Sequence, residues 1–150
     1  MKESRSVERE VKGEIMRTDV FVKLISTTKS ESDLNRDVSD AFVSFRDVAR
    51  RFSRFREGSE LSALNAASEI RVSPEMTALV VEALAFYEST GRVFDPSIIS
   101  DLEREGYASS YGEPSFGVPL LMAEKEPFRF GDLTVDLETS IIRKPKTLRI

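Results

Sequence analysis

The sequence predicts an α+β fold in which an antiparallel β-sheet packs against about three α-helices. Apolar residues alternate near the N-terminus, recur every three or four residues from Leu34 to Phe52, and form short runs between turn residues near the C-terminus. The length of 150 residues fits one domain. The hydrophobic share of 40% and the charged share of 32% are typical of a soluble globular protein.

The N-terminal segment Val11–Ile25 predicts one or two β-strands, because apolar residues alternate with polar ones in parts of it. A break is expected near Arg17–Asp19, and residues 1–7 are expected to be frayed. One face of the second half carries Val20, Val22 and Leu24, and the other face carries Phe21 and Ile25.

Leu34–Phe52 is the clearest helix in the sequence. Its apolar residues recur at spacings of three and four, so they share a stripe about 120° wide. Ser30 or Ser32 is expected to cap its N-terminus. Acidic residues crowd its start and arginines crowd its end, which suits the helix dipole. The stripe consists of Leu34, Val38, Ala41, Phe42, Phe45, Val48, Ala49 and Phe52.

Gly58 breaks the chain after this helix, and shorter elements follow. Ser59 is expected to cap a short helix, Ser73 followed by Pro74 is typical of a helix start, and Gly91 is expected to stop that helix. The expected elements are a helix from Ser59 to about Asn65, a strand over Glu69–Val72, a helix from Pro74 to about Thr90 and a helix from about Ser97 to Glu105. The apolar side of the helix that begins at Pro74 carries Leu79, Val80, Ala83, Leu84 and Tyr87.

Residues 107–127 are rich in Gly, Pro, Ser and Glu and predict a loop that is long for a compact domain. A lid, a docking loop and a family-specific insertion all remain open as its role. Short strands are expected after it, over Phe128–Phe130, Leu133–Leu137, Ser140–Arg143 and Thr147–Ile150. The last strand ends the chain without a polar residue, so a cut chain and an ordinary edge strand are both open interpretations.

The absence of Cys and His narrows the possible chemistry. Thiol catalysis, disulfides, a Ser-His-Asp triad and metals held by Cys or His are all excluded. A hard cation held by oxygen atoms stays possible, and Mg²⁺ is the natural candidate. The net charge of −4 argues against nucleic acid as the main partner. No signal peptide, membrane-spanning run or Cys for lipid attachment is visible, so the chain as written is expected in the cytoplasm.

Five short blocks follow one another along the chain. They are Met16-Arg17-Thr18, the run SRFREGSEL from Ser53 to Leu61 with Leu64-Asn65, Val72-Ser73-Pro74-Glu75, the run TGRVFDPS from Thr90 to Ser97, and Leu102 with Gly106-Tyr107. In order and spacing these blocks resemble the N-terminal half of the ApbE family of flavin transferases. The resemblance covers residues 14–150, which is nearly all of the chain.

The resemblance implies an activity and an architecture. ApbE enzymes take FAD and, with Mg²⁺, attach its FMN half to a Ser or Thr of an acceptor protein. Residues 1–150 would form the N-terminal portion of a single ApbE domain, which is T-fold-like. The family's Mg²⁺ ligands lie in later blocks, in the missing C-terminal half, so this chain is expected to be truncated and inactive alone. The alternatives are a non-catalytic FAD-binding module and a half-domain that needs a separately encoded C-terminal partner.

By the same resemblance, the residues expected to line the FAD site are Met16, Phe55, Arg56, Glu57, Val93, Phe94 and Asp95. No catalytic residue and no metal ligand is assigned. Phe55 offers either a flat face for a flavin or adenine ring or a continuation of the apolar helix stripe. Asp95 suits both a helix cap and a hydrogen bond to ribose or adenine. Arg17 stands where the family pattern has Gly, and its side chain would narrow the site or reach the pyrophosphate.

Two charged groups have competing interpretations. The first is a basic cluster of Arg46, Arg50, Arg51, Arg54 and Arg56. The cluster forms a solvated helix face, or it attracts the FAD pyrophosphate or an acidic partner. No aromatic residues are interleaved with these arginines, which argues against nucleic acid as the ligand. The second is Asp132, Asp136 and Glu138, whose even spacing marks the solvent face of a strand rather than a metal site.

Overall fold

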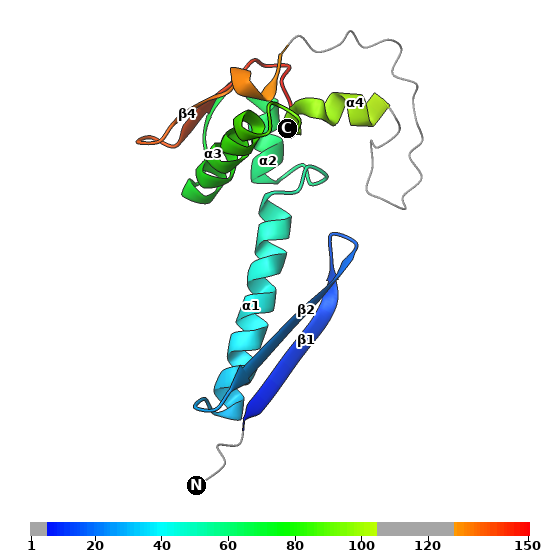
Figure 1. Cartoon of the computed structure of the whole chain (residues 1–150), viewed down its shortest axis with the longest axis vertical. Coiled ribbons are helices and arrows are strands. Elements are labelled where there is room, and N and C mark those ends of the chain that lie inside the picture. Colours follow the sequence, from blue (N-terminus) through cyan, green and yellow to red (C-terminus); the bar gives the residue numbers. More distant parts are fainter. Residues whose placement is uncertain (1–5, 105–127) are drawn as a thin grey trace. The chain divides into compact units, whose positions relative to one another are not determined.

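The structure is a computed structural model that describes residues 6–104 and 128–150 (Figure 1). The chain divides into two compact units, Met1–Arg51 and Phe52–Ile150. The first unit combines one helix with antiparallel strands and the second combines several helices with such strands, which confirms the expected α+β class. In the described part of the chain the strands form two separate sheets, of two and three strands, rather than one.

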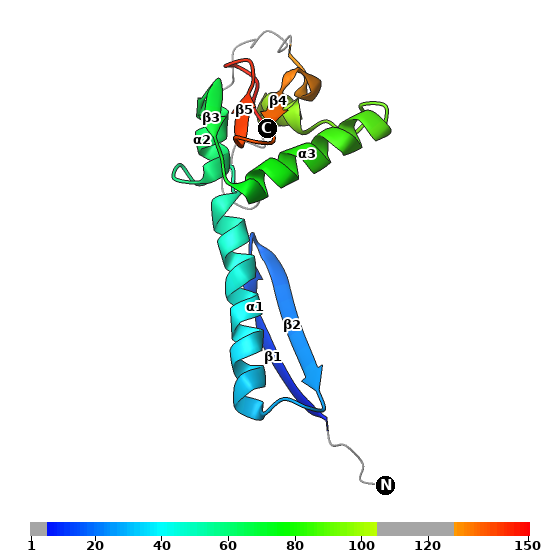
Figure 2. The same cartoon turned by 90° about the vertical axis from the view of Figure 1, so that its left-hand side faces the viewer.

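The first unit is a β-hairpin with a long helix along it. β1 (Val7–Ile15) pairs with β2 (Thr18–Ser26) in antiparallel register, with Val11 opposite Val22. The predicted break between two strands is confirmed, whereas the expected fraying of residue 7 is wrong because Val7 already pairs with Ser26. α1 (Glu31–Arg51) runs along this hairpin, as Figure 2 shows, and its packing is mainly against β1.

Alternation along the hairpin decides which face α1 covers. In β2 the residues Val20, Val22 and Leu24 are partly buried, while Phe21 and Ile25 on the other face are exposed, as the sequence predicts. Gly13 of β1 lies under the ring of Phe42, because a Cβ atom on Gly13 would come within 2.5 Å of Phe42 Cζ. A glycine at this position lets the helix approach the strand closely.

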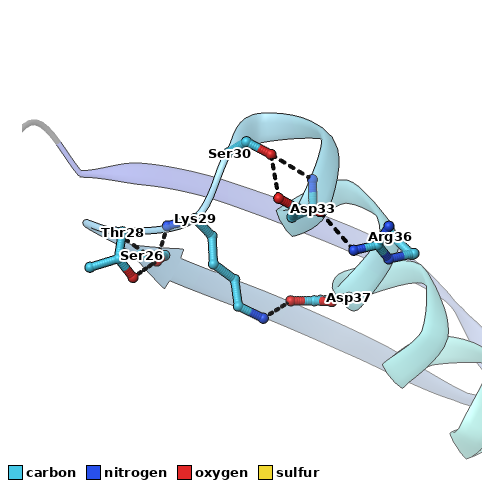
Figure 3. Close-up of polar contacts among 7 residues, drawn as sticks. All are labelled: Ser26, Thr28, Lys29, Ser30, Asp33, Arg36 and Asp37. Carbon is cyan, nitrogen blue, oxygen red and sulfur yellow. Dashed lines mark hydrogen bonds and ion pairs between the residues drawn. The ribbon is translucent and has the colours of Figure 1, made fainter.

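Local polar contacts determine where α1 begins (Figure 3). Ser30 Oγ accepts a hydrogen bond from the Asp33 N–H at 3.2 Å, so Ser30 is the capping serine of the two that the sequence offers. Hydrogen bonds from Ser30 Oγ and from Arg36 lower the pKa of Asp33. The Lys29 ammonium pairs with Asp37 one turn further on. Acidic side chains at this end also suit the helix dipole.

The second unit packs a short helix and a longer one around a small sheet. α2 (Glu60–Ala66) leads through β3 (Glu69–Arg71) into α3 (Pro74–Ser89), which is followed by the 3₁₀-helix η1 (Pro96–Ile98) and by α4 (Ile99–Arg104). After the undescribed residues come the 3₁₀-helix η2 (Phe130–Asp132), β4 (Thr134–Asp136) and β5 (Ile141–Arg143). The strand order is β3-β5-β4, and both pairs are antiparallel (Figure 2).

The core of the second unit lies between α2, α3 and this sheet. The Tyr87 and Phe130 rings meet edge to face, with centroids 5.9 Å apart. Glu60 ties α2 to α3, because its carboxylate accepts a hydrogen bond of 2.9 Å from Ser73 Oγ at the cap of α3. The buried core residues are Leu64, Val72, Met76, Val80, Tyr87, Phe130, Leu133, Ile142 and Leu148.

Several sequence predictions for this unit are wrong. Phe128–Phe130 does not form a strand, because Phe130 is the first residue of η2. The Leu133 N–H donates a hydrogen bond to the Phe130 carbonyl at the end of η2. Thr147–Ile150 is no strand either, although Leu148 is buried. Leu79, expected on the buried side of α3, is 46% exposed. The loop expected over residues 107–127 lies outside the described residues, and α4 ends at Arg104 within the described part.

Candidate functional site

The loop after α3 carries three of the expected site residues and is held by the Thr90 hydroxyl and by main-chain hydrogen bonds. Thr90 Oγ1 donates to the Phe86 carbonyl at 2.8 Å and accepts from the Phe94 N–H at 3.1 Å. Arg92 N–H donates to the Tyr87 carbonyl at 2.8 Å. Gly91 and Arg92 have φ angles of 61° and 71°, so the chain reverses through two left-handed residues. These bonds hold the loop backbone in one conformation.

The same loop presents apolar side chains outward. Val93 is 88% exposed. Phe94 is half exposed, and its ring meets the Phe86 ring edge to face, with centroids 6.1 Å apart. Because Phe86 supports one edge of Phe94, the remaining surface of this ring and the adjacent Val93 are open to a flat apolar ligand.

Asp95 closes this loop and starts the next helix. Its Oδ1 accepts hydrogen bonds from the Ser97 N–H at 2.9 Å and from Ser97 Oγ at 2.6 Å. The expected capping role of Asp95 is therefore confirmed. Its expected contact with ribose or adenine stays a prediction.

The loop before α2 carries Phe55, Arg56 and Glu57 and is tied to the first turn of that helix. Ser59 Oγ donates to the Ser53 carbonyl at 2.6 Å, and Ser59 N–H donates to the Arg56 carbonyl at 2.9 Å. Ser62 Oγ donates to the same Arg56 carbonyl at 2.8 Å. The backbone is thus held from two sides, while the side chains of the three expected site residues are exposed.

Phe55 does not extend the apolar helix stripe into the core, because its side chain is 48% exposed. The Arg54 guanidinium lies 4.2 Å from the centroid of its ring and covers one face. This arrangement leaves an aromatic face and a cationic group side by side on one loop. A planar ring that also carries negative charge fits such a pair.

Met16 belongs to the first unit and sits in the two-residue turn between β1 and β2. Met16 and Arg17 have φ angles of 53° and 55°, a conformation that this kind of turn needs and that Gly or Asn adopts more easily. The Met16 side chain is 73% exposed. The structure therefore presents Met16 at a hairpin tip, whereas Phe55–Glu57 and Val93–Asp95 lie on two loops of the second unit.

The described residues contain no group of three or more acidic side chains placed to hold a metal ion. Asp132 accepts a hydrogen bond from the Arg129 N–H at 2.7 Å and so closes η2. Asp136 caps the turn before β5, and hydrogen bonds from Thr139 and from the Glu138 N–H lower its pKa. Both carboxylates accept hydrogen bonds from main-chain N–H groups, and the prediction that they bind no metal stays a prediction.

The basic cluster is divided between the two units. Arg46 and Arg50 are exposed on α1, and Arg50 lies 3.4 Å from Asp47 one turn before it. Arg54 and Arg56 lie on the Phe55 loop, where Arg54 covers the phenyl ring. The α1 members therefore agree with a solvated helix face, and Arg54 is the member that lies at the candidate site.

The contacts that support the two loops were not predicted from the sequence. Phe86, Arg54 and Ser62 each hold one of the expected site residues in place. The signal for Ser62 was present, since it follows the capping Ser59 at the spacing of one helical turn. Phe86 offered no such signal, because its partner Phe94 lies beyond the end of the helix.

The fold and these loops define an α+β protein that presents two backbone-fixed loops with exposed aromatic residues. A family model described as the ApbE family matches residues 16–110, and the chain belongs to that family. The matched range includes every residue expected at the FAD site.

The fold of this chain is similar to that of a solved ApbE structure. The crystal structure of the ApbE protein from Thermotoga maritima superposes with a TM-score of 0.73 at 20% sequence identity. The match covers 96% of this chain but only 47% of that protein, so the chain spans about half the length of this relative. A search of curated proteins found no match. No helix in the described part of the chain has the length and apolar character needed to cross a membrane.

Proposed function

We propose that this chain forms the FAD-facing N-terminal part of an FAD:protein FMN transferase. In the complete enzyme, a Ser or Thr hydroxyl of an acceptor protein attacks the FMN phosphorus of FAD. The bond to the AMP phosphate breaks, AMP leaves, and the hydroxyl proton is released. The observation that carries this proposal is the family match over residues 16–110, which contains both exposed aromatic loops.

The chemistry of the loops supports FAD as the ligand. Phe55 and Phe94 offer exposed ring faces against which an isoalloxazine or adenine ring would stack. The exposed Arg56 would pair with the pyrophosphate, since a guanidinium binds phosphate oxygens in a bidentate manner. Glu57 and Asp95 would accept hydrogen bonds from ribose hydroxyls. Met16 would add a polarisable apolar contact at the hairpin tip.

The described residues do not fit a Mg²⁺ site, because they hold no suitable group of acidic side chains. Phosphoryl transfer depends on neutralising the charge that develops on the phosphate. From the resemblance to the family, and not from this absence, we propose that the metal ligands lie in the part of the ApbE fold that this chain does not span. On this proposal the chain orients FAD, and transfer requires residues from elsewhere.

A second candidate is a half-domain that acts only with a complementary chain. The observation that favours it is the exposed apolar flank of α3. Leu79 and Phe86, seven residues apart and thus on one side of the helix, are 46% and 52% exposed. A complementary chain that packs on this flank would bury both side chains. A non-catalytic FAD-binding module is the remaining candidate and would leave both side chains as exposed as they are here.

FAD binding to the purified chain tests whether the loops form a flavin site. We expect saturable quenching of FAD fluorescence, and we expect Phe55→Ala to weaken it about tenfold, as loss of one stacking ring would. Phe21→Ala is the matched control, because Phe21 is equally exposed but lies on the outer face of the hairpin. Equal affinity of both variants would contradict the assignment of Phe55.

A transfer assay then separates the candidates. The chain is incubated with FAD, Mg²⁺ and an acceptor flavoprotein, and AMP release and protein-bound flavin fluorescence are measured. FAD binding without AMP release supports the orienting role proposed for this chain. Turnover by the chain alone at the rate of a complete ApbE enzyme would refute our assignment of the metal ligands to another part of the fold.

A further inference from the structure

The main chain of Ile150 is held by a side chain, and Thr147–Ile150 belong to no strand in the described part of the chain. Asn65 Nδ2 donates to the main-chain oxygen of Ile150 at 2.8 Å, and Ile150 N–H donates to Asn65 Oδ1 at 2.8 Å. One amide side chain thus pairs with both the N–H and a main-chain oxygen of Ile150, as a neighbouring strand residue would. This pairing joins two residues 85 positions apart in sequence.

A buried lysine reinforces the same junction. Lys144 Nζ donates to the Leu148 carbonyl at 2.7 Å and to the Asn65 carbonyl at 3.2 Å. Lys144 N–H also donates to the Ser68 carbonyl at 2.9 Å. The Asn65 carbonyl belongs to the last turn of α2, where carbonyls lack intrahelical partners, so Lys144 satisfies a group that helix geometry leaves open.

The opposite end of α2 holds the Phe55 loop. Ser59 and Ser62, in its cap and first turn, bind the Ser53 and Arg56 carbonyls as described above. α2 has only seven residues, and a helix this short is not stable in water by itself. Its position therefore depends on Leu64, which is fully buried, and on the hydrogen bonds at its two ends.

We propose that Asn65 is a positioning residue for the candidate FAD site. By pairing with Ile150, it anchors the C-terminal end of α2 to the core, and α2 in turn sets the position of the loop that carries Phe55, Arg56 and Glu57. Lys144 supports Asn65 by holding its carbonyl. The effect on FAD binding rests on the proposed function, whereas the effect on the loop does not.

Amide hydrogen exchange of the folded chain tests the effect on the loop. In Asn65→Ala we expect the Ser59 and Ser62 amides to exchange about threefold to tenfold faster, in line with the loss of one or two hydrogen bonds. The Val72 amide, which is bonded to the Ser140 carbonyl in the sheet region, should be unchanged. A general loss of stability would accelerate all three amides together, and that outcome would overturn the positioning role.

FAD affinity provides the second measurement, at a temperature where every variant is folded. Asn65→Ala should weaken FAD binding about threefold to tenfold. Asn35→Ala is the matched control, because Asn35 is exposed on α1 in the other unit. If Asn65→Ala retained both the wild-type exchange rates in the loop and the wild-type affinity, the proposal would be refuted.

A second variant and the exchange measurement cover the cases in which Asn65→Ala does not fold or the wild-type chain binds no FAD. Should Asn65→Ala fail to fold, Asn65→Asp keeps an oxygen for the Ile150 N–H but replaces the donor to the Ile150 oxygen with a charged acceptor oxygen, and we expect faster exchange at the same loop amides. Should the wild-type chain bind no FAD, the proposed function fails, and the exchange rates of the loop amides still decide whether Asn65 positions the loop.

Discussion

Replacement of Ser59 by Ala removes the hydroxyl group that both caps α2 and tethers the Phe55 loop. Ser59 is 4% exposed, so water does not replace the lost contacts. Its Oγ accepts a hydrogen bond from the Ser62 N–H at 3.0 Å and donates one to the Ser53 carbonyl at 2.6 Å. We expect Ser59→Ala to destabilise the second unit and to weaken FAD binding.

The magnitude follows from the two bonds. Loss of an N-cap serine costs about 1 kcal/mol. The Ser53 carbonyl, left without its partner in a partly buried loop, adds about 1 to 2 kcal/mol. We therefore expect the free energy of unfolding to fall by about 2 to 3 kcal/mol, which is a large share of the stability of a small domain.

Urea denaturation followed by far-ultraviolet circular dichroism measures this change. Ser30→Ala is the matched control, since Ser30 caps α1 through one hydrogen bond to the Asp33 N–H but is exposed and tethers no candidate site loop. Ser30→Ala should cost about 1 kcal/mol or less and leave FAD affinity unchanged.

Comparison of the two variants shows whether the Ser59 hydroxyl tethers the Phe55 loop and whether this tether serves a flavin site. If Ser59→Ala and Ser30→Ala destabilise the protein equally, the second hydrogen bond of Ser59 contributes nothing, and our account of the loop is wrong. If Ser59→Ala costs more stability but leaves FAD affinity intact, the tether exists without serving a flavin site.

Three further predictions concern other parts of the chain. Gly13→Ala places a Cβ atom against the Phe42 ring and should lower the free energy of unfolding, measured by thermal denaturation, by about 1 to 3 kcal/mol. Phe42→Leu should reduce this loss in the double variant, and additive effects of the two substitutions would contradict the close contact. Burial, with a smaller effect of Arg149, lowers the pKa of Lys144 in the folded chain, so the unfolded state binds more protons between that lowered value and 10.5. The free energy of unfolding should therefore rise with pH in that window and the rise should be smaller in Lys144→Met, whereas equal slopes would refute this. Asp95→Asn should keep the helix cap and the stability of the folded chain but weaken FAD binding. Unchanged FAD affinity would contradict the assignment of the Asp95 carboxylate to the FAD site.

Helix caps and helix faces, which depend on residues close together in the sequence, could be predicted from it. Ser59 and Ser73 cap helices because a serine hydroxyl reaches the N–H groups two or three residues ahead wherever the chain turns into a helix. The 3.6-residue spacing of Leu34 and Val38 placed both on the buried side of α1. The five blocks led to the family, because their order does not depend on how the chain folds.

Periodicity was insufficient where a helix is apolar on more than one side. α3 carries apolar residues nearly all round, so spacing alone could not show that Val80 faces the core while Leu79 is exposed. The turn at Met16 and Arg17 lacks the usual Gly or Asn, and its left-handed conformation accompanies the strand pairing on both sides of it.

The end of the chain shows what only the tertiary structure decided. Thr147–Ile150 is apolar enough to be a strand, but the partner of Ile150 is the side chain of Asn65, which comes from the end of α2. The sequence by itself determined the helix caps, the alternating strand faces and the family. The exposure of Phe55 and Phe94 could be seen only in the folded chain, where no distant segment buries their rings. The partner of Ile150 depended on a contact between distant segments, because a buried polar group must be paired by whatever the fold brings beside it.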